Sequence, residues 1–260
     1  MVKYLSKLTF RYIIAGKVSN GGRNMLGRVC VFGRGGGNKK LYRFIDFYRR
    51  LNCYGIIYRS LYDPNRTARI SFVLFGNGLT SCLLKMEGLR RFSKIYCGSG
   101  NEVCNDVSLN GYSLTLRNIG SFNVVSNVES KPFYGGSICR AGGSSCVLLG
   151  KDKFKGILKL RSGWHLEISL DSIASVGKID KIYFNNVIMG SAGKRRALGF
   201  RPKVRGVAKN PCDHPHGGGN GKKAKPPVPR NSWSTVFKWK HTKMKKVDRK
   251  KRYLFKTIYE

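Results

Sequence analysis

A cationic, glycine-rich stretch near the C-terminus, residues 190–221, constrains this chain more than any other part of it. Its sequence is GSAGKRRALGFRPKVRGVAKNPCDHPHGGGNG, with seven Lys or Arg among residues 194–209 and a single acid, Asp213. No apolar repeat of 3.6 or 2 residues runs through it, so neither an amphipathic helix nor a half-buried strand is predicted. Eight glycines and three prolines favour an extended, sharply turning backbone without its own core. Such a segment suits a polyanion, and its spread-out cations fit a phosphodiester chain better than one compact anion.

Positive charge is concentrated at the two ends of the chain. The 260 residues carry a formal net charge of +37, and residues 1–45 hold ten Lys or Arg and no acid. Residues 190–260 hold twenty-one against three acids, whereas residues 46–189 hold nineteen against ten. The middle is therefore predicted to be the globular body, and both ends are expected to order on a partner. Nucleic acid is preferred over an anionic membrane, because no apolar run approaches the ~18 residues of a spanning helix.

Short β-strands are predicted from Leu41 onward. Residues 54–62 form a strand candidate, and residues 69–75 and 79–84 flank a Gly-Asn-Gly loop that is typical of a hairpin. A second block has strands expected over 122–128, 146–149, 156–161 and 164–170, followed by a helical turn over 185–193. Short strands at this spacing, without a long helical pattern, indicate small barrels.

Two further basic stretches also point to nucleic acid. Residues 33–40, GRGGGNKK, could cradle phosphate on backbone N–H groups, although the G-x-x-x-x-G-K-[S/T] pattern of a nucleotide P-loop is absent. A flexible linker is the alternative for this stretch. Near the C-terminus Trp233, Phe237 and Trp239 interleave with lysines as in base-stacking surfaces, and a basic tail covers residues 243–252.

The cysteines and the N-terminus carry weaker signals. The eight cysteines include no C-x-x-C pair, which favours small buried thiols over a disulfide framework or a zinc site. The basic, acid-free first 17 residues loosely suit a transit peptide. An RNA-contacting arm fits the same composition and is preferred.

Motifs in a fixed order run along nearly the whole chain. They are GRN at 22–24 with GR at 27–28, GGG at 35–37, YR at 42–43 with IDF at 45–47, YDPNR at 62–66, GG at 135–136, RSG at 161–163 and Gly177. The strongest is RPKVRGVA at 201–208, followed by Asn-Pro at 210–211 and DHPHGGG at 213–219. With these motifs the chain resembles the universal large-ribosomal-subunit protein two, the "L-two" family.

This resemblance implies a mostly β fold, in which an OB-type barrel is followed by an SH3-like barrel, with long extended basic N- and C-terminal extensions. The expected domains are an extension over 1–40, the OB-like RNA-binding barrel over 41–112, the SH3-like barrel over 113–189 and an extended basic region over 190–260. The implied role is structural: binding rRNA near the peptidyl-transferase region and supporting assembly, subunit association and tRNA positioning. Expected partners are large-subunit rRNA and neighbouring ribosomal proteins. No membrane span, homo-oligomer, metal or cofactor is expected, although rRNA-bound Mg²⁺ could lie nearby.

The residues expected to bind RNA are basic, histidine or glycine residues, most of them within the matched motifs. They are Arg23, Arg28, Arg34, Lys39, Lys40, Arg66, Arg140, Lys194, Arg195, Arg196, Arg201, Lys203, Arg205, His214, His216, Gly217 and Gly218. Arg201, Lys203, Arg205 and the run at 194–196 are the strongest candidates for phosphate. Tyr134 or Trp233 is the candidate for stacking on a base.

Two other functions compete with this interpretation. His214 matches the family histidine debated as a contributor to peptide-bond formation and could act as a general base. Its neighbours Asp213 and His216 establish no catalytic geometry, so no enzymatic activity is expected and a role in contacting RNA or fixing the loop is preferred. A metal held by His214 and His216 would lack a clear fourth ligand unless Cys212 joined. The second alternative is a free OB-type RNA-binding translation factor, for which the two long basic ends are unsuited.

The chain departs from the family pattern at three positions. Asn38 stands where the family usually has His, Ala197 where it has Trp, and Asn220 where it has Glu. These changes weaken contacts specific to those side chains and keep the glycine and arginine framework. Frequent Cys, Phe, Tyr, Ile and Asn resemble a divergent, organelle-encoded member. The expected location is therefore the large ribosomal subunit of a mitochondrion, with a plastid or the bacterial cytoplasm as alternatives.

Overall fold

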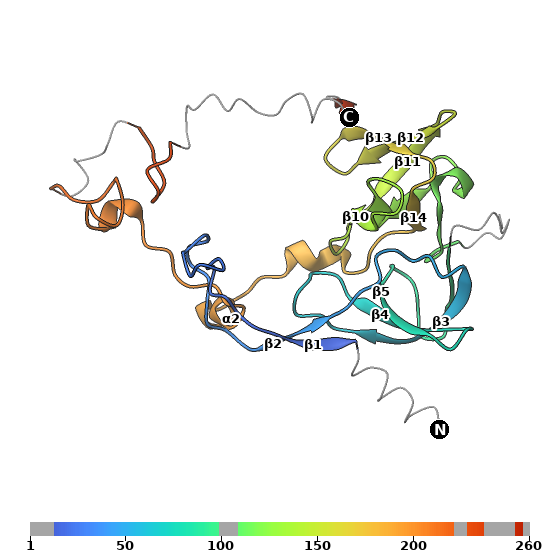
Figure 1. Cartoon of the computed structure of the whole chain (residues 1–260), viewed down its shortest axis with the longest axis horizontal. Coiled ribbons are helices and arrows are strands. Elements are labelled where there is room, and N and C mark those ends of the chain that lie inside the picture. Colours follow the sequence, from blue (N-terminus) through green and yellow to red (C-terminus); the bar gives the residue numbers. More distant parts are fainter. Residues whose placement is uncertain (1–12, 99–108, 221–227, 237–252, 257–260) are drawn as a thin grey trace, which may run out of the picture. The chain divides into compact units, whose positions relative to one another are not determined.

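The computed structural model describes residues 13–98, 109–220, 228–236 and 253–256 (Figure 1). The chain separates into two compact units. The larger, here called the body, comprises residues 1–17, 40–188 and 248–260, and the smaller, here called the arm, comprises residues 18–39 and 189–247. The basic tail at 243–252, Phe237 and Trp239 lie outside the described residues.

The body is mostly β, as the sequence predicts, and it contains every strand assigned in the described residues. In chain order the strands are β1 (Ile14–Lys17), β2 (Lys40–Arg43), β3 (Cys53–Leu61), β4 (Ile70–Phe75), β5 (Thr80–Leu84), β6 (Lys94–Cys97), β7 (Ser113–Thr115), β8 (Val124–Ser126), β9 (Val128–Glu129), β10 (Gly136–Ile138), β11 (Cys146–Lys151), β12 (Lys155–Leu160), β13 (Trp164–Ser169), β14 (Ile173–Val176) and β15 (Tyr253–Lys256). Two 3₁₀ turns, η1 (Leu116–Asn118) and η2 (Ile182–Asn186), complete it. This architecture is consistent with the predicted OB-type barrel followed by an SH3-like barrel.

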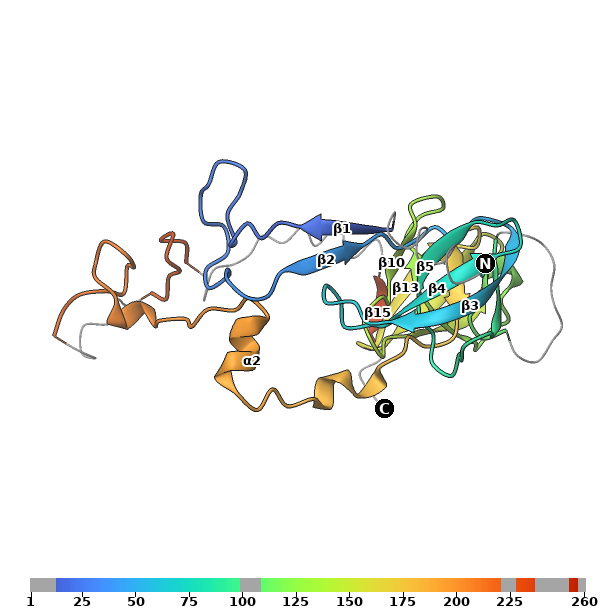
Figure 2. The ribbon, with the colours of Figure 1, turned by 90° about the horizontal axis from the view of Figure 1, so that it is seen from below.

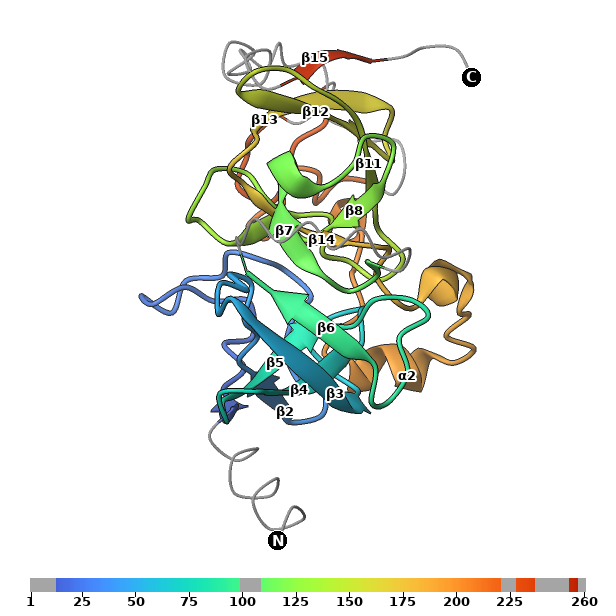
Figure 3. The ribbon, with the colours of Figure 1, turned by 90° about the vertical axis from the view of Figure 1, so that its right-hand side faces the viewer.

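One continuous sheet of eleven strands joins the two halves of the body. Its order is β15-β13-β12-β11-β8-β14-β7-β6-β3-β4-β5, and β1-β2 and β9-β10 form separate antiparallel pairs. The halves meet at the parallel pair β6–β7, where Cys97 lies opposite Ser113. Figure 3 shows β3 to β6 below this junction and the strands from β7 onward above it.

Turn chemistry and a nearly continuous run of buried residues in β4 explain the β4–β5 hairpin. The side chain of Asn77 accepts a hydrogen bond from the Leu79 N–H at 3.1 Å, and Gly78 has a φ of +80°, which a residue without Cβ adopts freely. The hairpin contributes Val73, Phe75 and Leu83 to the core of the first barrel, and all three are buried. The predicted hairpin with its Gly-Asn-Gly loop is therefore confirmed.

The strand predicted over 122–128 is interrupted. Asn127 separates β8 from β9, has a φ of +49° and donates its N–H to the Cys139 carbonyl at 3.0 Å. Asn tolerates the left-handed region better than most residues, so the chain turns there and β9 leaves the main sheet to pair with β10.

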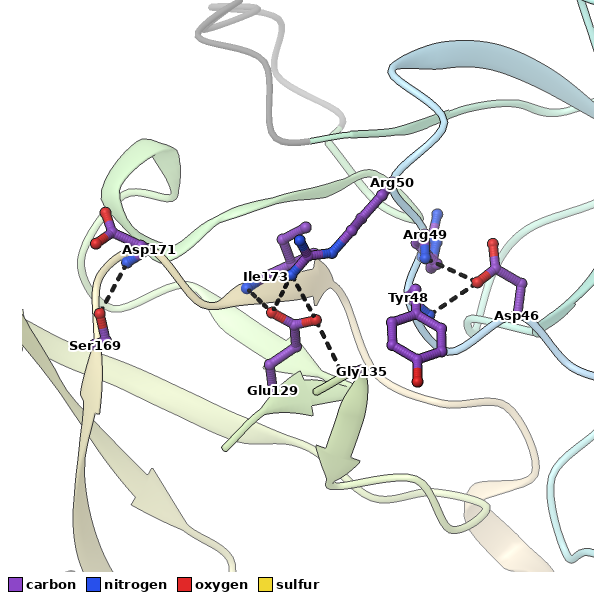
Figure 4. A network of polar contacts seen from close by, with 9 residues as sticks. All are labelled: Asp46, Tyr48, Arg49, Arg50, Glu129, Gly135, Ser169, Asp171 and Ile173. Atoms are coloured by element: carbon purple, nitrogen blue, oxygen red, sulfur yellow. Dashed lines mark hydrogen bonds and ion pairs between the residues drawn. The ribbon is translucent and has the colours of Figure 1, made fainter. Parts of the chain in front are cut away.

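Two neighbouring arginines tie the halves of the body together. Arg49 is 3% exposed, and its guanidinium donates to Ser175 Oγ at 2.7 Å and to the Gly111 carbonyl at 2.6 Å. Arg50 donates to both carboxylate oxygens of Glu129 at 3.1 Å (Figure 4). Residues just before β3 thereby hold β9 and β14 in place, through the buried side chain of Arg49 and the partly exposed side chain of Arg50.

The arm contains one short α-helix, α2 (Ala192–Ala197), and one 3₁₀ turn, η3 (Gly206–Ala208) (Figure 2). The Ser191 hydroxyl caps α2 by accepting the Lys194 N–H at 3.4 Å. The helical turn predicted over 185–193 is displaced, because η2 ends at Asn186 and α2 begins at Ala192. Ala, Lys and Arg favour helix intrinsically, so α2 forms without an apolar stripe.

Candidate nucleic-acid interface

Two distant segments of sequence build the framework of the arm. The Gly35 N–H donates to the Gly199 carbonyl at 3.1 Å, and the Asn38 N–H donates to the Ala197 carbonyl at 3.0 Å. In the opposite direction, the Arg201 N–H donates to the Gly33 carbonyl at 2.9 Å. The triple glycine therefore lies directly against the segment that leads into the RPKVRGVA motif.

Glycine is required where these segments meet. Gly37 has a φ of +88°, and a Cβ there would stand 2.7 Å from both the Ala197 carbonyl oxygen and the Gly199 backbone nitrogen. Neither backbone atom can move without breaking the pairing. Gly37 thus permits a close approach between two segments of the protein itself.

Three of the predicted RNA-binding arginines gather around Phe200. The Arg34 guanidinium lies 4.1 Å from the ring centroid of Phe200, and that of Arg195 lies 5.8 Å from it. Arg196 donates to the Phe200 carbonyl at 3.3 Å. All three arginines are exposed, so Phe200 organises a surface of positive charge that faces solvent.

Arg201, Lys203 and Arg205 follow on alternate positions and are all exposed. The backbone at Arg205 is extended, with φ −63° and ψ 143°, so these side chains are spaced along the chain and do not fold back on it. All ion pairs formed among the described residues lie in the body. The cations in the described part of the arm therefore remain unneutralised, with Asp213 as the single acid among the residues described there.

The two histidines belong to a compact loop. The His216 N–H donates to His214 Nδ1 at 3.0 Å, and the Arg230 N–H donates to His216 Nε2 at 2.9 Å. Partial burial, His216 and the Lys209 ammonium lower the pKa of His214 below its usual value. His214 also occupies the space beside Gly206, where a Cβ would collide with the imidazole ring. These contacts use the histidines to shape the loop.

Gly217 and Gly218 close the same loop. Gly217 donates its N–H to the His214 carbonyl at 2.8 Å, and Gly218 donates to the Lys209 carbonyl at 3.2 Å. A Cβ on Gly217 would collide with the carbonyl oxygens of Lys209 and Asn210. Within the described ranges, no group of three or more His, Cys, Asp or Glu side chains converges as a metal site requires.

The remaining predicted residues divide between the two units. Arg23, Arg28 and Lys39 are exposed in the arm. Lys40, Arg66 and Arg140 belong to the body.

In the body, Arg66 donates to the buried Asp63 carboxylate at 2.6 Å. The guanidinium of Arg140 lies 5.0 Å from the Phe47 ring centroid, and that of Arg66 lies 5.8 Å from it. These two arginines thus have partners within the protein.

Phe32 and Lys209 are not among the residues predicted from the sequence to bind RNA. The Phe32 ring lies 4.7 Å from the Trp233 ring, and Lys209 Nζ lies 5.4 Å from the Phe32 centroid. Lys209 could have been found from its place in the basic run. Phe32 carries no such signal, because its partner lies about two hundred positions away in sequence.

Comparisons with known proteins identify the family of the chain. The family model "Ribosomal Proteins L2, RNA binding N-terminal domain" matches residues 10–97, and "Ribosomal Proteins L2, C-terminal domain" matches residues 109–234. The protein named large ribosomal subunit protein uL2 of Orientia tsutsugamushi is 42% identical over 89% of this chain and 83% of its own length. Proteins of the same name are 40% identical in Rickettsia typhi, over 89% and 83%, and 39% identical in Ehrlichia ruminantium (strain Gardel), over 90% and 83%. Among the described residues, no helix is both long and apolar enough to cross a membrane.

Proposed function

The chain belongs to the ribosomal protein L2 family (large ribosomal subunit protein uL2), and from that premise we propose that its arm binds large-subunit rRNA through exposed, unneutralised cations. The protein is a structural constituent of the large ribosomal subunit, with rRNA and ribosomal proteins as its partners. The observation that carries the proposal is the segregation of charge. Ion pairs among the described residues lie in the body, and the basic residues described in the arm have no carboxylate partner.

The three cations Arg201, Lys203 and Arg205 are the centre of the proposed contact. Each Lys or Arg that neutralises a phosphate releases condensed counterions, which favours binding at low salt. All three are exposed within one short stretch of extended chain, so a single segment of phosphodiester backbone can contact them. The cluster of Arg34, Arg195 and Arg196 around Phe200 extends the same positive surface.

Several finer features belong to the same proposal. The interface lies near the peptidyl-transferase region and supports subunit association and tRNA positioning. The domain boundaries lie at residues 40, 112 and 189. The protein acts as one copy per subunit, without catalysis or a cofactor of its own. His214 shapes its loop, and its Nδ1 is already engaged by the His216 N–H, which favours positioning over proton transfer. The subunit is mitochondrial; tagging the protein and separating organelles from cytosol tests this location.

Incorporation into particles tests the proposed contact. We expect the triple variant Arg201→Ala/Lys203→Ala/Arg205→Ala to be absent from large subunits on a sucrose gradient. The matched control is Lys94→Ala/Lys153→Ala/Arg161→Ala, which removes the same charge from exposed positions of the body. Normal incorporation of the first variant, or equal loss of both, contradicts the proposed role of the arm. A free translation factor would not sediment in stoichiometric amount with large subunits.

A further inference from the structure

The arm contains a hollow of about 500 Å³. The proposed binding of phosphates by exposed cations gives this hollow no role. All of its lining residues belong to the arm, so it is a feature of that unit alone. The residues that matter for its chemistry are two aromatic side chains, two lysines and one histidine: Phe32, Trp233, Lys203, Lys209 and His214. Its volume lies within the range of sites that bind small organic groups.

One wall of the hollow is formed by two aromatic rings that are partly exposed to solvent. The rings of Phe32 and Trp233 are tilted by 41° to each other, with centroids 4.7 Å apart. Phe32 is 41% exposed and Trp233 is 52% exposed, so both rings offer free surface. The Asn231 side chain accepts the Trp233 N–H at 3.0 Å and the Thr235 N–H at 2.9 Å, which fixes the backbone turn that carries the indole. A fixed, half-exposed indole is a ready stacking platform.

The rest of the lining is cationic and offers a hydrogen-bond donor. Lys209 Nζ lies over the Phe32 ring, and the methylenes of Lys203 run along Gly33, where a Cβ would be 3.2 Å from Lys203 Cγ. None of the lining residues is acidic. Because His214 Nδ1 accepts the His216 N–H, the neutral imidazole carries its proton on Nε2 and can donate it. A ligand that matches this lining has a flat ring and a negative charge.

We propose that this hollow binds one unpaired nucleotide of the rRNA, with its base on Trp233 and Phe32 and its phosphate near Lys203 and Lys209. The inference rests on the proposed rRNA-binding function and adds a defined subsite to it. A nucleotide is favoured over a side chain of a neighbouring protein, because an apolar side chain would leave both ammonium groups without a counter-charge. His214 then donates to the ribose, base or phosphate at the edge of the hollow.

The first experiment measures binding of the full-length protein to large-subunit rRNA fragments. We expect Phe32→Leu/Trp233→Leu to weaken binding about 5- to 100-fold, the range of base-stacking losses. Trp233→Phe should retain most of the affinity. The matched control is Trp164→Leu, which removes an indole that is 42% exposed on β13 of the body and should leave binding unchanged.

Single abasic substitutions along the RNA supply the second, decisive arm. One abasic position should reproduce the loss with the wild-type protein, and the same position should add nothing further in the Phe32→Leu/Trp233→Leu variant. Binding by that variant equal to wild type overturns the nucleotide site, while the proposed function stands if the Arg201, Lys203 and Arg205 triple variant still loses affinity. If the triple variant binds normally, the proposed function itself fails.

Crosslinking in assembled wild-type subunits needs no substitution, so a folding defect cannot affect it. Ultraviolet irradiation should join a peptide that contains Phe32 or Trp233 to a single nucleotide. Capture of a ribosomal protein at these positions instead would overturn the proposal.

Discussion

Gly37 and Gly199 lie so close together that a Cβ on Gly37 would stand 2.7 Å from the backbone nitrogen of Gly199. This contact joins the N-terminal and C-terminal parts of the arm at one point. The neighbouring Gly36 also has a positive φ, +65°, but a Cβ there would have no atom within 4 Å. Gly36 therefore needs only a residue that tolerates a left-handed backbone. Gly37 needs that and also the absence of a Cβ, because another backbone segment lies against it.

Gly37→Ala should therefore separate the two segments, whereas Gly36→Ala should cost only the strain of a left-handed Ala, about 1–2 kcal/mol. We expect Gly37→Ala to be strongly depleted from large subunits and Gly36→Ala to be incorporated nearly normally. Quantitative mass spectrometry of purified subunits measures both. Equal incorporation of the two variants would show that the contact at Gly37 does not hold the arm together.

The salt dependence of RNA binding should report the cations at 201, 203 and 205. Each phosphate contact contributes roughly 0.7–0.9 to the slope of log affinity against log salt, so the triple Ala variant should lower that slope by about 2–3. Filter binding of the full-length protein to an rRNA fragment at several salt concentrations measures the slope. Lower affinity with an unchanged slope would mean that these residues act through folding of the arm.

Glu129 should be important for the stability of the body. It is 1% exposed and accepts hydrogen bonds from Arg50, from the Gly135 N–H at 3.0 Å and from the Ile173 N–H at 3.1 Å (Figure 4). Glu129→Ala leaves these donors unpaired in the interior, and we expect it to lower the free energy of unfolding by about 3 kcal/mol or more. Urea unfolding measures the change. Asp171→Ala, which breaks an exposed pair with Arg117, should have little effect.

The ionisation of Asp63 should make the free energy of unfolding depend on pH under acidic conditions. Burial opposes ionisation, but the Asn65 N–H and the Arg66 guanidinium outweigh it and hold the pKa of the Asp63 carboxyl below its usual value. A lowered folded-state pKa stabilises the protein above the unfolded pKa of about 3.9, and this stabilisation is lost as pH falls through the folded pKa. The stability difference between wild type and Asp63→Asn should therefore shrink from pH 5 to pH 3. A difference that stays constant in thermal melts over this range would contradict the assignment.

Local patterns predicted those elements whose cause is local. The β4–β5 hairpin follows from its loop residues and the apolar runs on either side of them, and the strands β3, β12 and β13 lie within a residue of their predicted bounds. The break at Asn127 was missed because the pattern of residues 122–128 is apolar on both sides of it. Only the pairing of its N–H with the distant Cys139 carbonyl fixes that turn.

The sequence predicted which residues to expect in the candidate interface, but it did not predict how those residues are arranged in space. The glycine and arginine motifs identified the family, which the comparisons confirm. They did not show that Arg66 forms an ion pair with Asp63, or that Phe32 meets Trp233. Contacts between residues so far apart in sequence depend on the tertiary path of the chain, which periodicity and spacing do not encode.

The hydrogen bond between the Arg201 N–H and the Gly33 carbonyl has a consequence for biosynthesis. These residues are separated by 168 positions, so at 5–20 residues per second the nascent chain needs roughly 10–30 s after Gly33 to synthesise its partner Arg201. The arm therefore completes its backbone pairing only after the strands of the body from β1 to β14 have been synthesised.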